Sequence, residues 1–450
     1  MNWGLLLMEM LFFYSMIAIS VAINISSLDD AFIDVMAFGI TRGRMSKGAI
    51  TVEIPKIAVF VANWHEEEVL GKMVEGNLAR IPYATVSLYL GVYPNDTGTL
   101  QVARELAEKH PTRVTVIVNR MQGPTSKGQM LNEMFTQVFD GTDESPDIVV
   151  LHDSEDVIDP RTFEVYAAYA QSGYDFIQVP VFSLNRGRAV VASTYMDEFA
   201  ERHTREMIVR NAVGATIPSA GVGTGVTRKL IQHFLATRKQ VLMSGTVTED
   251  YILGVEAKRA GFKAAFAAVS ADDPRGLDFV ATREFFPKTL SASIKQKTRW
   301  VYGINFEAMH KLGWEGDGWD KYFFMRDRKG IVTNFLPPVS LALLIMLFMG
   351  AFDLTDMPYE WQYWFNLSIL FNMFALVMRY CIRVGACHQV YGTWDLLGIA
   401  LRWPVALYIN MAAVYRAWIT YVGVSRFATQ PIVWSKTTHE LPEDFMSARR

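Results

Sequence analysis

Three long apolar segments limit most strongly how this chain can fold. Residues 5–25 are almost wholly apolar, with Glu9 as the single charged residue, and residues 331–352 carry no charge at all. A third apolar segment, residues 364–378, is flanked by aromatic residues. A helix needs about 20 predominantly apolar residues to cross a bilayer. The sequence therefore predicts three membrane helices, over residues 1–27, 331–352 and 361–380.

The first apolar segment has an alternative reading as a cleaved signal peptide. A signal peptide requires a basic n-region and a small-residue cleavage pattern. The start, Met1-Asn2-Trp3, contains no basic residue, and no cleavage pattern precedes Leu28. These features favour a retained anchor.

Basic residues near the predicted membrane helices indicate their orientation, because Lys and Arg accumulate in short cytoplasmic flanks. The loop at residues 353–360 has three acidic residues and no basic one. The basic flanking residues all belong to the opposite side: Arg42, Arg44, Lys47, Lys56, Arg326, Arg328, Lys329, Arg379 and Arg383. We therefore expect residues 28–330 to be cytoplasmic, with the 353–360 loop and the N-terminus outside.

A fourth hydrophobic stretch, residues 393–424, is interrupted by polar residues. Arg402, Asn410 and Arg416 lie within it, and Pro404 is expected to kink it. Basic residues flank it on both sides, so a crossing would place one basic flank outside the membrane. We predict helices that lie in the membrane interface over residues 389–424. A fourth membrane span is the alternative.

Overall composition excludes several classes of protein. The chain has 43 basic and 46 acidic residues, so no basic excess suggests a nucleic-acid partner. With 51% hydrophobic residues it is not a disordered chain. Its two cysteines, Cys381 and Cys387, are too few for a disulfide framework and have no neighbouring ligands for a zinc site. Both are expected to be reduced thiols.

The region between the first two membrane helices alternates strand-like and helix-like stretches. Strands are predicted at residues 57–61, 86–92, 114–118 and 148–151, and helices at residues 66–78, 100–109 and 128–138. This alternation predicts a mostly parallel sheet with helices on both faces. Ligands bind such sheets at the carboxyl ends of the strands. Functional residues should therefore follow the strands directly.

Acidic residues follow two of these strands. His65-Glu66-Glu67-Glu68 comes after the first, and an acidic first turn of a helix is the simpler reading because it suits the helix dipole. Asp153 and Glu155 follow the fourth strand with D-x-E spacing, which points both side chains the same way. Such a pair can hold a hard divalent cation together with phosphate oxygens. A solvated acidic loop is the alternative.

Further signals occur at glycine-rich turns and helix starts. Gly123-Pro124-Thr125-Ser126-Lys127-Gly128 precedes a helix and suits a phosphate, although an ordinary capped turn would look the same. The glycine-rich run at residues 218–225 allows close backbone approach to a ligand, or forms a flexible loop. Thr248-Glu249-Asp250 opens a helix, where Thr248 could simply be a cap. Gln296, Arg299 and Trp300 form a Q-x-x-R-W pattern on a helical stretch, where Arg299 could be a membrane-surface charge.

Each signal is modest alone, but their order together with the membrane segments resembles the processive family 2 glycosyltransferases. Cellulose, chitin and hyaluronan synthases belong to this group. The resemblance runs from about Ile57 to Trp300, and Q-x-x-R-W is its most specific element. It implies a GT-A fold, an α/β nucleotide-diphospho-sugar transferase domain, inserted between transmembrane helices.

The predicted organisation follows from this resemblance. A cytoplasmic interface segment at 28–54 would lead into the transferase domain at 55–310, and an interface linker at 311–330 would lead back to the membrane. Residues 425–450 would form a C-terminal tail similar to a gating loop. Several short stretches are similar to a subgroup of inner-membrane members linked to surface polysaccharide and phage adsorption: residues 27–30, 123–127, 151–153, 218–224, 326–330 and 434–439.

The resemblance also implies roles for individual residues. Asp250 would be the catalytic base, and Mg²⁺ or Mn²⁺ would bind Asp153 and Glu155. The residues implied to contact the donor nucleotide are Glu66, Asp96, Lys127, Asp153, Gln296, Arg299 and Trp300, and from the tail Lys436, Thr438 and His439. Those implied to contact the acceptor are Gly221, Gly223, Thr224, Glu249 and Trp300. Asp96 departs from the family pattern, because it lies a few positions later than the aspartates that usually end the second strand.

The implied function is inverting sugar transfer from a nucleotide-sugar, with a UDP-sugar as the expected donor. The acceptor would be a growing exopolysaccharide at the bacterial inner membrane, coupled to secretion through an outer-membrane partner. Relatives often continue into a domain that binds cyclic di-GMP, and such a domain would lie outside these 450 residues. Two alternatives stay open: transfer of a single sugar to a lipid carrier, and an inactive scaffold for phage adsorption.

Overall fold

A seven-stranded mixed sheet forms the centre of the protein in the computed structural model, which describes residues 3–44, 53–141, 145–185, 189–270, 279–351, 353 and 357–426. The strand order is β3-β2-β1-β4-β8-β6-β9. The strands are β1 (Ile57–Ala62), β2 (Val86–Val92), β3 (Val114–Val118), β4 (Ile148–His152), β6 (Phe176–Gln178), β8 (Thr224–Thr227) and β9 (Ala264–Phe266). Strands β3, β2, β1 and β4 run parallel, as predicted, whereas β8 is antiparallel to both of its neighbours.

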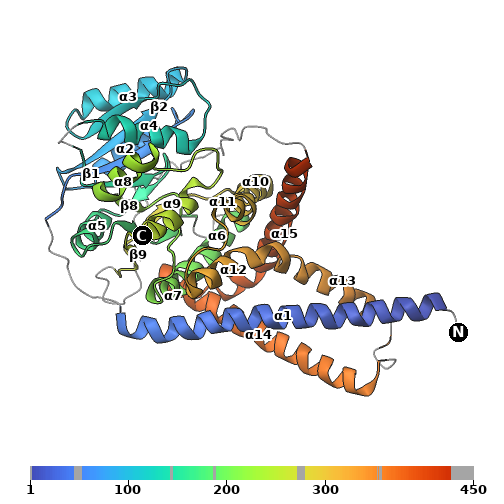
Figure 1. Ribbon diagram of the computed structural model, residues 1–450. Helices are drawn as coiled ribbons and strands as arrows, with labels where there is room; N and C mark the ends of the chain where they lie inside the picture. Colours follow the sequence, from blue (N-terminus) through green and yellow to red (C-terminus); the bar gives the residue numbers. More distant parts are fainter. Residues whose placement is uncertain are drawn as a thin grey trace.

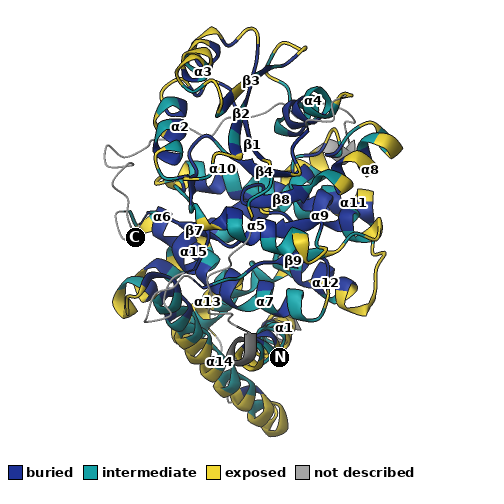
Figure 2. Ribbon diagram, turned by 90° about the vertical axis from the view of Figure 1, so that its left-hand side faces the viewer, coloured by how far each residue is buried: buried dark blue, intermediate teal, exposed yellow. Residues whose placement is uncertain are grey.

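Helices cover both faces of this sheet because successive side chains of a strand point to opposite sides. On one face, Val59 and Val61 of β1 pack with α2 (Leu70–Leu78), α3 (Thr97–Lys109) and α5 (Arg161–Gln171). On the other face, Ala58 and Phe60 pack with α4 (Lys127–Phe139), α8 (Arg228–Arg238) and α9 (Glu249–Arg259). Figure 2 shows the strands buried between these helices. The α/β expectation is confirmed.

The elements that complete the domain lie between the sheet and the membrane helices. A small sheet has the order β5-β10-β7 and comprises β5 (Val157–Ile158), β7 (Val181–Ser183) and β10 (Thr282–Glu284). The helices are α6 (Val190–Glu201), η1 (Arg202–Glu206), α7 (Met207–Ala212), α10 (Leu290–Val301), η2 (Tyr302–Glu307), α11 (Ala308–Leu312) and α12 (Gly318–Thr333). Helix α2 starts at Leu70 rather than at the predicted Glu66, because His65 has a positive φ of 57° and residues 66–69 form a turn.

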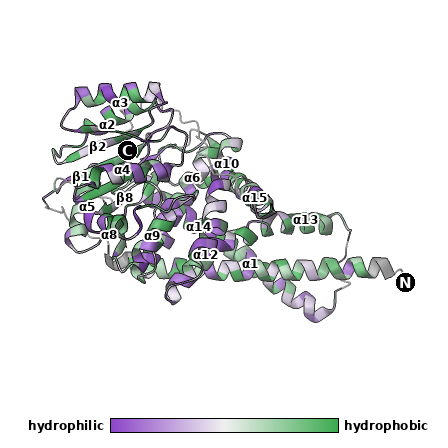
Figure 3. Ribbon diagram, turned by 45° about the horizontal axis from the view of Figure 1, so that its top comes forward, coloured by the Kyte–Doolittle hydropathy of each residue, from purple (hydrophilic) through white to green (hydrophobic). Residues whose placement is uncertain are grey.

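Four helical segments in the described part of the chain are long and apolar enough to cross a membrane: Leu7–Ile40, Gly318–Phe348, Tyr359–Tyr391 and Leu396–Gly423. They belong to α1 (Trp3–Arg44), to α12 with α13 (Leu336–Phe348), to α14 (Tyr359–Tyr391) and to α15 (Leu396–Arg426). Figure 3 shows apolar residues around α1 and α13. The first and second segments overlap the predicted membrane helices at residues 1–27 and 331–352, and the third includes the predicted helix at residues 361–380.

Several element boundaries differ from the predicted segments. Helix α1 continues past residue 27 to Arg44, so much of the expected interface segment is helical. Most of the expected linker at 311–330 is α12, which starts at a capping box formed by Asp317 and Asp320. Helix α14 extends beyond the predicted 361–380 and ends where Gly392 adopts a left-handed conformation. Local capping sets the start of α12 and the end of α14, and hydropathy does not report it.

Helix α15 runs at an angle to α1 and lies beside the transferase domain (Figure 1). It packs against α6 and α10. Its polar residues face these helices: Arg402 pairs with Asp197 at 2.9 Å, and Asn410 binds both Glu198 and Lys297. Pro404 lies inside the helix without ending it. An interfacial position of this segment stays a prediction, which the contacts of Arg402 and Asn410 with protein groups support.

Candidate active site

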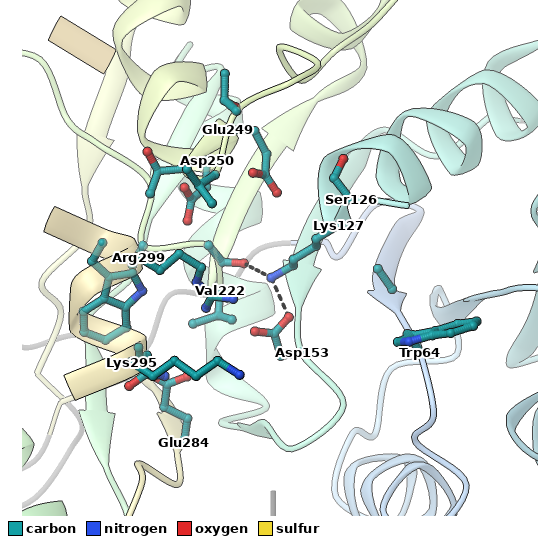
Figure 4. A pocket seen from close by; sticks show the side chains of 18 of the residues that line it. Trp64, Ser126, Lys127, Asp153, Val222, Glu249, Asp250, Glu284, Lys295 and Arg299 are labelled. Atoms are coloured by element: carbon teal, nitrogen blue, oxygen red, sulfur yellow. Dashed lines mark hydrogen bonds and ion pairs between the residues drawn. The ribbon is translucent and has the colours of Figure 1, made fainter. Parts of the chain in front are cut away.

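A cavity of about 400 Å³ opens at the carboxyl ends of β1 and β4 (Figure 4). The starts of α4 and α9, the glycine-rich loop before β8, and α10 form its other walls. Ten of the residues proposed from the sequence line it: Glu66, Lys127, Asp153, Glu155, Gly221, Glu249, Asp250, Gln296, Arg299 and Trp300. The tertiary fold thus brings together residues spread over more than 230 positions of sequence.

Lys127 lies at the centre of this cavity. It is the first residue of α4, whose N-cap Ser126 accepts a hydrogen bond from Gln129 N–H. Its Nζ lies 2.5 Å from Asp153 Oδ1 and donates to the Gly221 carbonyl at 3.3 Å. Burial alone would lower the pKa of the Lys127 ammonium, but the charges of Asp153, Asp250 and Glu249 raise it above its ordinary value. A permanently charged ammonium beside a helix N-terminus suits a phosphate.

Two adjacent acids open α9 and differ in burial. Glu249 is 7% exposed, and burial together with the neighbouring Asp250 charge raises its pKa to about 7. Asp250 is only partly buried; burial raises its pKa too, while Lys127 and Arg299 oppose that change. Asp250 Oδ1 accepts a hydrogen bond from Tyr251 N–H at 2.8 Å. Its second oxygen faces Gly221, where an added Cβ would lie 2.5 Å from Oδ2.

Helix α10 presents one face to the cavity and the other to α6 and α15. Gln296, Arg299 and Trp300 line the cavity. On the far face, Lys297 donates to Asn410 of α15 at 2.8 Å and pairs with Glu198 of α6. The buried Gln296 Oε1 has no hydrogen-bond partner among the described residues. Since a buried acceptor without a partner is costly, a ligand donor is the natural complement to this oxygen.

The acidic residues near Lys127 form a cluster with a surplus of negative charge. Glu284 of β10 lines the cavity, and burial together with Asp156, Glu155 and Asp153 raises its pKa well above the usual range. Asp156 is itself buried and bonded to His152 at 2.7 Å. Repulsion among carboxylates is relieved by a bound cation, and oxygen ligands suit Mg²⁺ or Mn²⁺. The residues present therefore fit a divalent metal on Asp153 and Glu155.

Three proposed residues of the described chain do not line the cavity. Asp96 is buried as the N-cap of α3 and accepts from Thr99 N–H and from His65 N–H. It also lies with His65 and Glu67 in a group whose ligand atoms are within 4.8 Å of one another. Gly223 and Thr224 belong to the packed start of β8, where Thr224 Oγ1 is 2.7 Å from Gln178 Oε1. Lys436, Thr438 and His439 lie outside the described residues.

The cavity also contains residues that the sequence did not point to. Trp64 stands across the cavity from Arg299 and Lys295 (Figure 4). It lies two residues after the end of β1 and two residues before Glu66, so its position after a strand was an available signal. No such signal marked three other lining residues: Glu284 of β10, Lys295 of α10 and Thr420 of α15. These elements reach the cavity only through tertiary packing.

Comparison with known proteins places the chain in a family. The family described as "Glycosyltransferase like family 2" matches residues 55–303, more than half of the chain. Two curated relatives are each 30% identical over 465 residues: bacteriophage adsorption protein B of Escherichia coli K12 and bacteriophage N4 adsorption protein B of E. coli O157:H7. The alignment covers 95% of this chain but 62% of each relative.

A solved structure shares the fold. The mannosyltransferase PcManGT from Pyrobaculum calidifontis, in complex with GDP-Man and Mn²⁺, superposes with a TM-score of 0.55 at 14% identity. The match covers 81% of this chain and 98% of that one. It confirms that the fold is of the GT-A type, with membrane-length helices on both sides of the domain in sequence. The family match, which spans every described cavity-lining residue except Thr420, shows that this chain is a glycosyltransferase of family 2.

Proposed function

We propose that this protein transfers a sugar from a UDP-sugar to a growing exopolysaccharide at the bacterial inner membrane, with inversion at the anomeric carbon. The observation that carries the proposal is the composition of the cavity. Two cationic side chains, Lys127 and Arg299, line the same cavity as three acidic ones: Asp153, Glu155 and Asp250. A diphosphate needs the cations, and an acceptor hydroxyl needs a nearby base. Membership of family 2 supports the reaction class.

The position of each residue in the cavity indicates its proposed role in the reaction. Glu66 and Trp64 follow β1 and would bind the nucleoside. Lys127 at the start of α4 and Arg299 on α10 would bind the diphosphate and stabilise the charge that grows on it as it leaves. Asp250 would accept the proton of the acceptor hydroxyl, whose oxygen then bonds to the anomeric carbon as the bond to the diphosphate breaks. Inversion needs one base and no protein nucleophile, by analogy with inverting glycosidases.

The acceptor would lie between Asp250 and the α10 wall. Trp300 offers an aromatic surface there, supported by edge contacts to Tyr195 and Phe199 at ring-centroid distances of 6.1 and 6.3 Å. Glu249, Gly221 and the unpaired Gln296 oxygen line the same side. Gly223 and Thr224 would act only indirectly, by holding the glycine-rich loop against β8.

A divalent metal, proposed on Asp153 and Glu155, would neutralise charge on the diphosphate when bound. We expect excess EDTA to abolish transfer and added Mg²⁺ or Mn²⁺ to restore it. Glu155→Gln should raise the metal concentration needed for half-maximal rate, whereas Glu105→Gln on the exposed face of α3 should not. Full activity in excess chelator would contradict a metal-dependent reaction.

A donor screen tests the reaction itself. Purified protein is incubated with UDP-linked and GDP-linked sugars, with GDP-mannose included because PcManGT was solved with it. Released nucleoside diphosphate and product mass are measured. A ladder of masses supports a polymer, and a single added sugar supports transfer to a lipid carrier. No release from any donor would favour an inactive adsorption scaffold.

The remaining parts of this proposal rest on resemblance alone. They are secretion through an outer-membrane partner, regulation by cyclic di-GMP through a further domain, and contact of Lys436, Thr438 and His439 with the donor. The chain spans 62% of the length of its curated relatives, so their activity as whole proteins is not transferred to it.

A further inference from the structure

Helix α12 lies between the catalytic helix α9 and the membrane helix α1 in both Figure 1 and Figure 2. It contains the run Arg326-Asp327-Arg328-Lys329, which the proposed reaction does not use. The charged side chains of this run are directed to different neighbours. Arg326 and Lys329 pair with acids of α1, whereas Asp327 pairs with groups of the transferase domain.

Asp327 is held in a buried network that reaches the residue after Asp250. Its two oxygens accept hydrogen bonds from Arg210 Nη1 and Nη2 at 2.9 and 2.8 Å, and Asp327 and Arg210 are 1% and 0% exposed. Tyr251 Oη donates to Asp327 Oδ2 at 2.8 Å. Because Tyr251 also donates its backbone N–H to Asp250 Oδ1, Asp327 is two contacts away from the proposed base.

A second pair of contacts fixes the other end of α9 to the same helix. Lys258 Nζ donates to both oxygens of Asp320 at 2.7 Å. Tyr251 and Lys258 are two helical turns apart on α9, as are Asp327 and Asp320 on α12. Between these pairs, Gly254 packs so closely on the Ile217 carbonyl that an added Cβ would lie 2.2 Å from it. Helix α9 is thus held between α12 and the glycine-rich loop.

The same segment of α12 is anchored to α1. Arg326 Nη2 lies 3.1 Å from Asp30 Oδ1, and Lys329 Nζ lies 2.6 Å from both Asp29 and Asp30. Tyr322 Oη donates to Asp29 Oδ1 at 2.7 Å. Two stretches that share a sequence resemblance with adsorption-type relatives, residues 27–30 and 326–330, therefore meet in space.

We infer that Asp327 is a positioning residue for sugar transfer, which sets Asp250 through Tyr251 and links it to the membrane helix α1. The inference rests on the proposed role of Asp250 as the base. A base must lie within hydrogen-bond reach of the proton that it accepts, and a small displacement of such a group lowers the rate strongly. Tyr251 is not among the described residues that line the cavity, so its hydroxyl bond to Asp327 can be removed without removing a cavity group.

The test compares three variants by steady-state kinetics with a donor that the wild type uses. Tyr251→Phe removes one hydroxyl and leaves the Arg210–Asp327 pair intact, so it should fold. We expect its kcat to fall about ten- to a hundredfold with little change in the KM for the donor. Asp327→Asn should show the same pattern, and the double variant should be no slower than Asp327→Asn alone.

Lys258→Met is the matched control, because it removes the other contact between α9 and α12, far from Asp250. It should lower the melting temperature while its kcat stays near that of the wild type. The inference is overturned if Tyr251→Phe turns over at the wild-type rate, or if Lys258→Met loses as much kcat as Tyr251→Phe. A wild type that releases no nucleoside diphosphate from any donor would instead overturn the proposed function.

Discussion

Asp250 and Glu249 are neighbours in sequence but face different surroundings. Glu249 packs against Gly128, where an added Cβ would lie 2.9 Å from its Cγ, and it is almost fully buried. Asp250 is more exposed, and the charge of Lys127 opposes the rise that burial causes in its pKa. A base must be ionised to accept a proton, so the Lys127 charge favours Asp250 for this role.

Asp250→Asn keeps the shape of the side chain and removes its basicity. A positioned base contributes about 10²–10⁴ in rate, so nucleoside diphosphate release should fall by that factor. Nucleotide binding, measured by calorimetry, should persist because Lys127 and Arg299 are unchanged. Transfer by Asp250→Asn at the normal rate would assign the base elsewhere, with Glu249 as the first candidate.

Glu249 should make the protein less stable as pH rises. Its folded pKa of about 7 exceeds the ordinary value of 4.5, so the folded state favours the protonated form. Below about pH 4.5 the carboxyl is protonated in both states and costs nothing; between pH 4.5 and 7 the cost of ionising it develops, and above pH 7 it is complete. Glu249→Gln should therefore raise the melting temperature at pH 8 and leave it unchanged at pH 4.5.

The control for this prediction is Glu105→Gln, an exposed substitution on α3. At pH 4.5 and at pH 8, the melting temperature of this variant should equal that of the wild type. An equal gain for Glu249→Gln at pH 4.5 and pH 8 would mean that removal of the buried charge is not the cause.

At the scale of elements, the loop before β8 sets the room around the base. Gly221 has a φ of +81°, and an added Cβ would meet Asp250 Oδ2. Gly245 has a similar φ of +69°, but nothing lies within 4 Å of its Cβ position. The two glycines therefore share the backbone strain that a side chain would introduce and differ in contact with Asp250.

Gly221→Ala should displace Asp250 and lower the rate of transfer, whereas Gly245→Ala should retain it. Both should lose about 1–2 kcal/mol of unfolding free energy, because an L-residue is strained at positive φ. Activity and thermal stability are measured for both variants. Equal rates for the two would show that the approach of Gly221 to Asp250 has no influence on the reaction.

At the scale of the whole molecule, α1, α13 and α14 extend together away from the transferase domain (Figure 1). They contact one another through α1. The polar residues Ser20 and Ser368 meet within this group, with 2.6 Å between their Oγ atoms. Basic residues lie at the end of these helices nearest the transferase domain, where Arg379 and Arg383 contact Glu201. This arrangement is consistent with a cytoplasmic transferase domain.

The start of α14 should face the periplasm. Tyr359 is 80% exposed, so a cysteine there, in a variant with Cys381→Ser and Cys387→Ala, should react with an impermeant thiol reagent in intact spheroplasts. Thr237→Cys on exposed α8 in the same background should react only after lysis. The reverse labelling pattern would invert the proposed topology.

The sequence by itself determined the four parallel strands β1 to β4, their order along the chain and most of the charged residues of the cavity. Strands β2 and β3 have the predicted bounds, and Glu66, Lys127, Asp153 and Asp250 lie where strands end or helices begin. These features are local: a run of apolar residues forms a buried strand, and the carboxyl ends of parallel strands share one edge. Order along the chain therefore predicts proximity for groups that follow such strands.

Only the tertiary structure decided which residues that do not follow a predicted strand line the cavity. It also decided which contacts hold the cavity residues in place. Glu284, Lys295 and Thr420 reach the cavity from β10, α10 and α15, and Asp327 reaches Tyr251 from α12. Asp96, which the resemblance implied as a donor contact, is the N-cap of α3 and is not among the described residues that line the cavity. No local pattern encodes such contacts, because each depends on how distant helices pack, and packing is a property of the complete set of buried side chains.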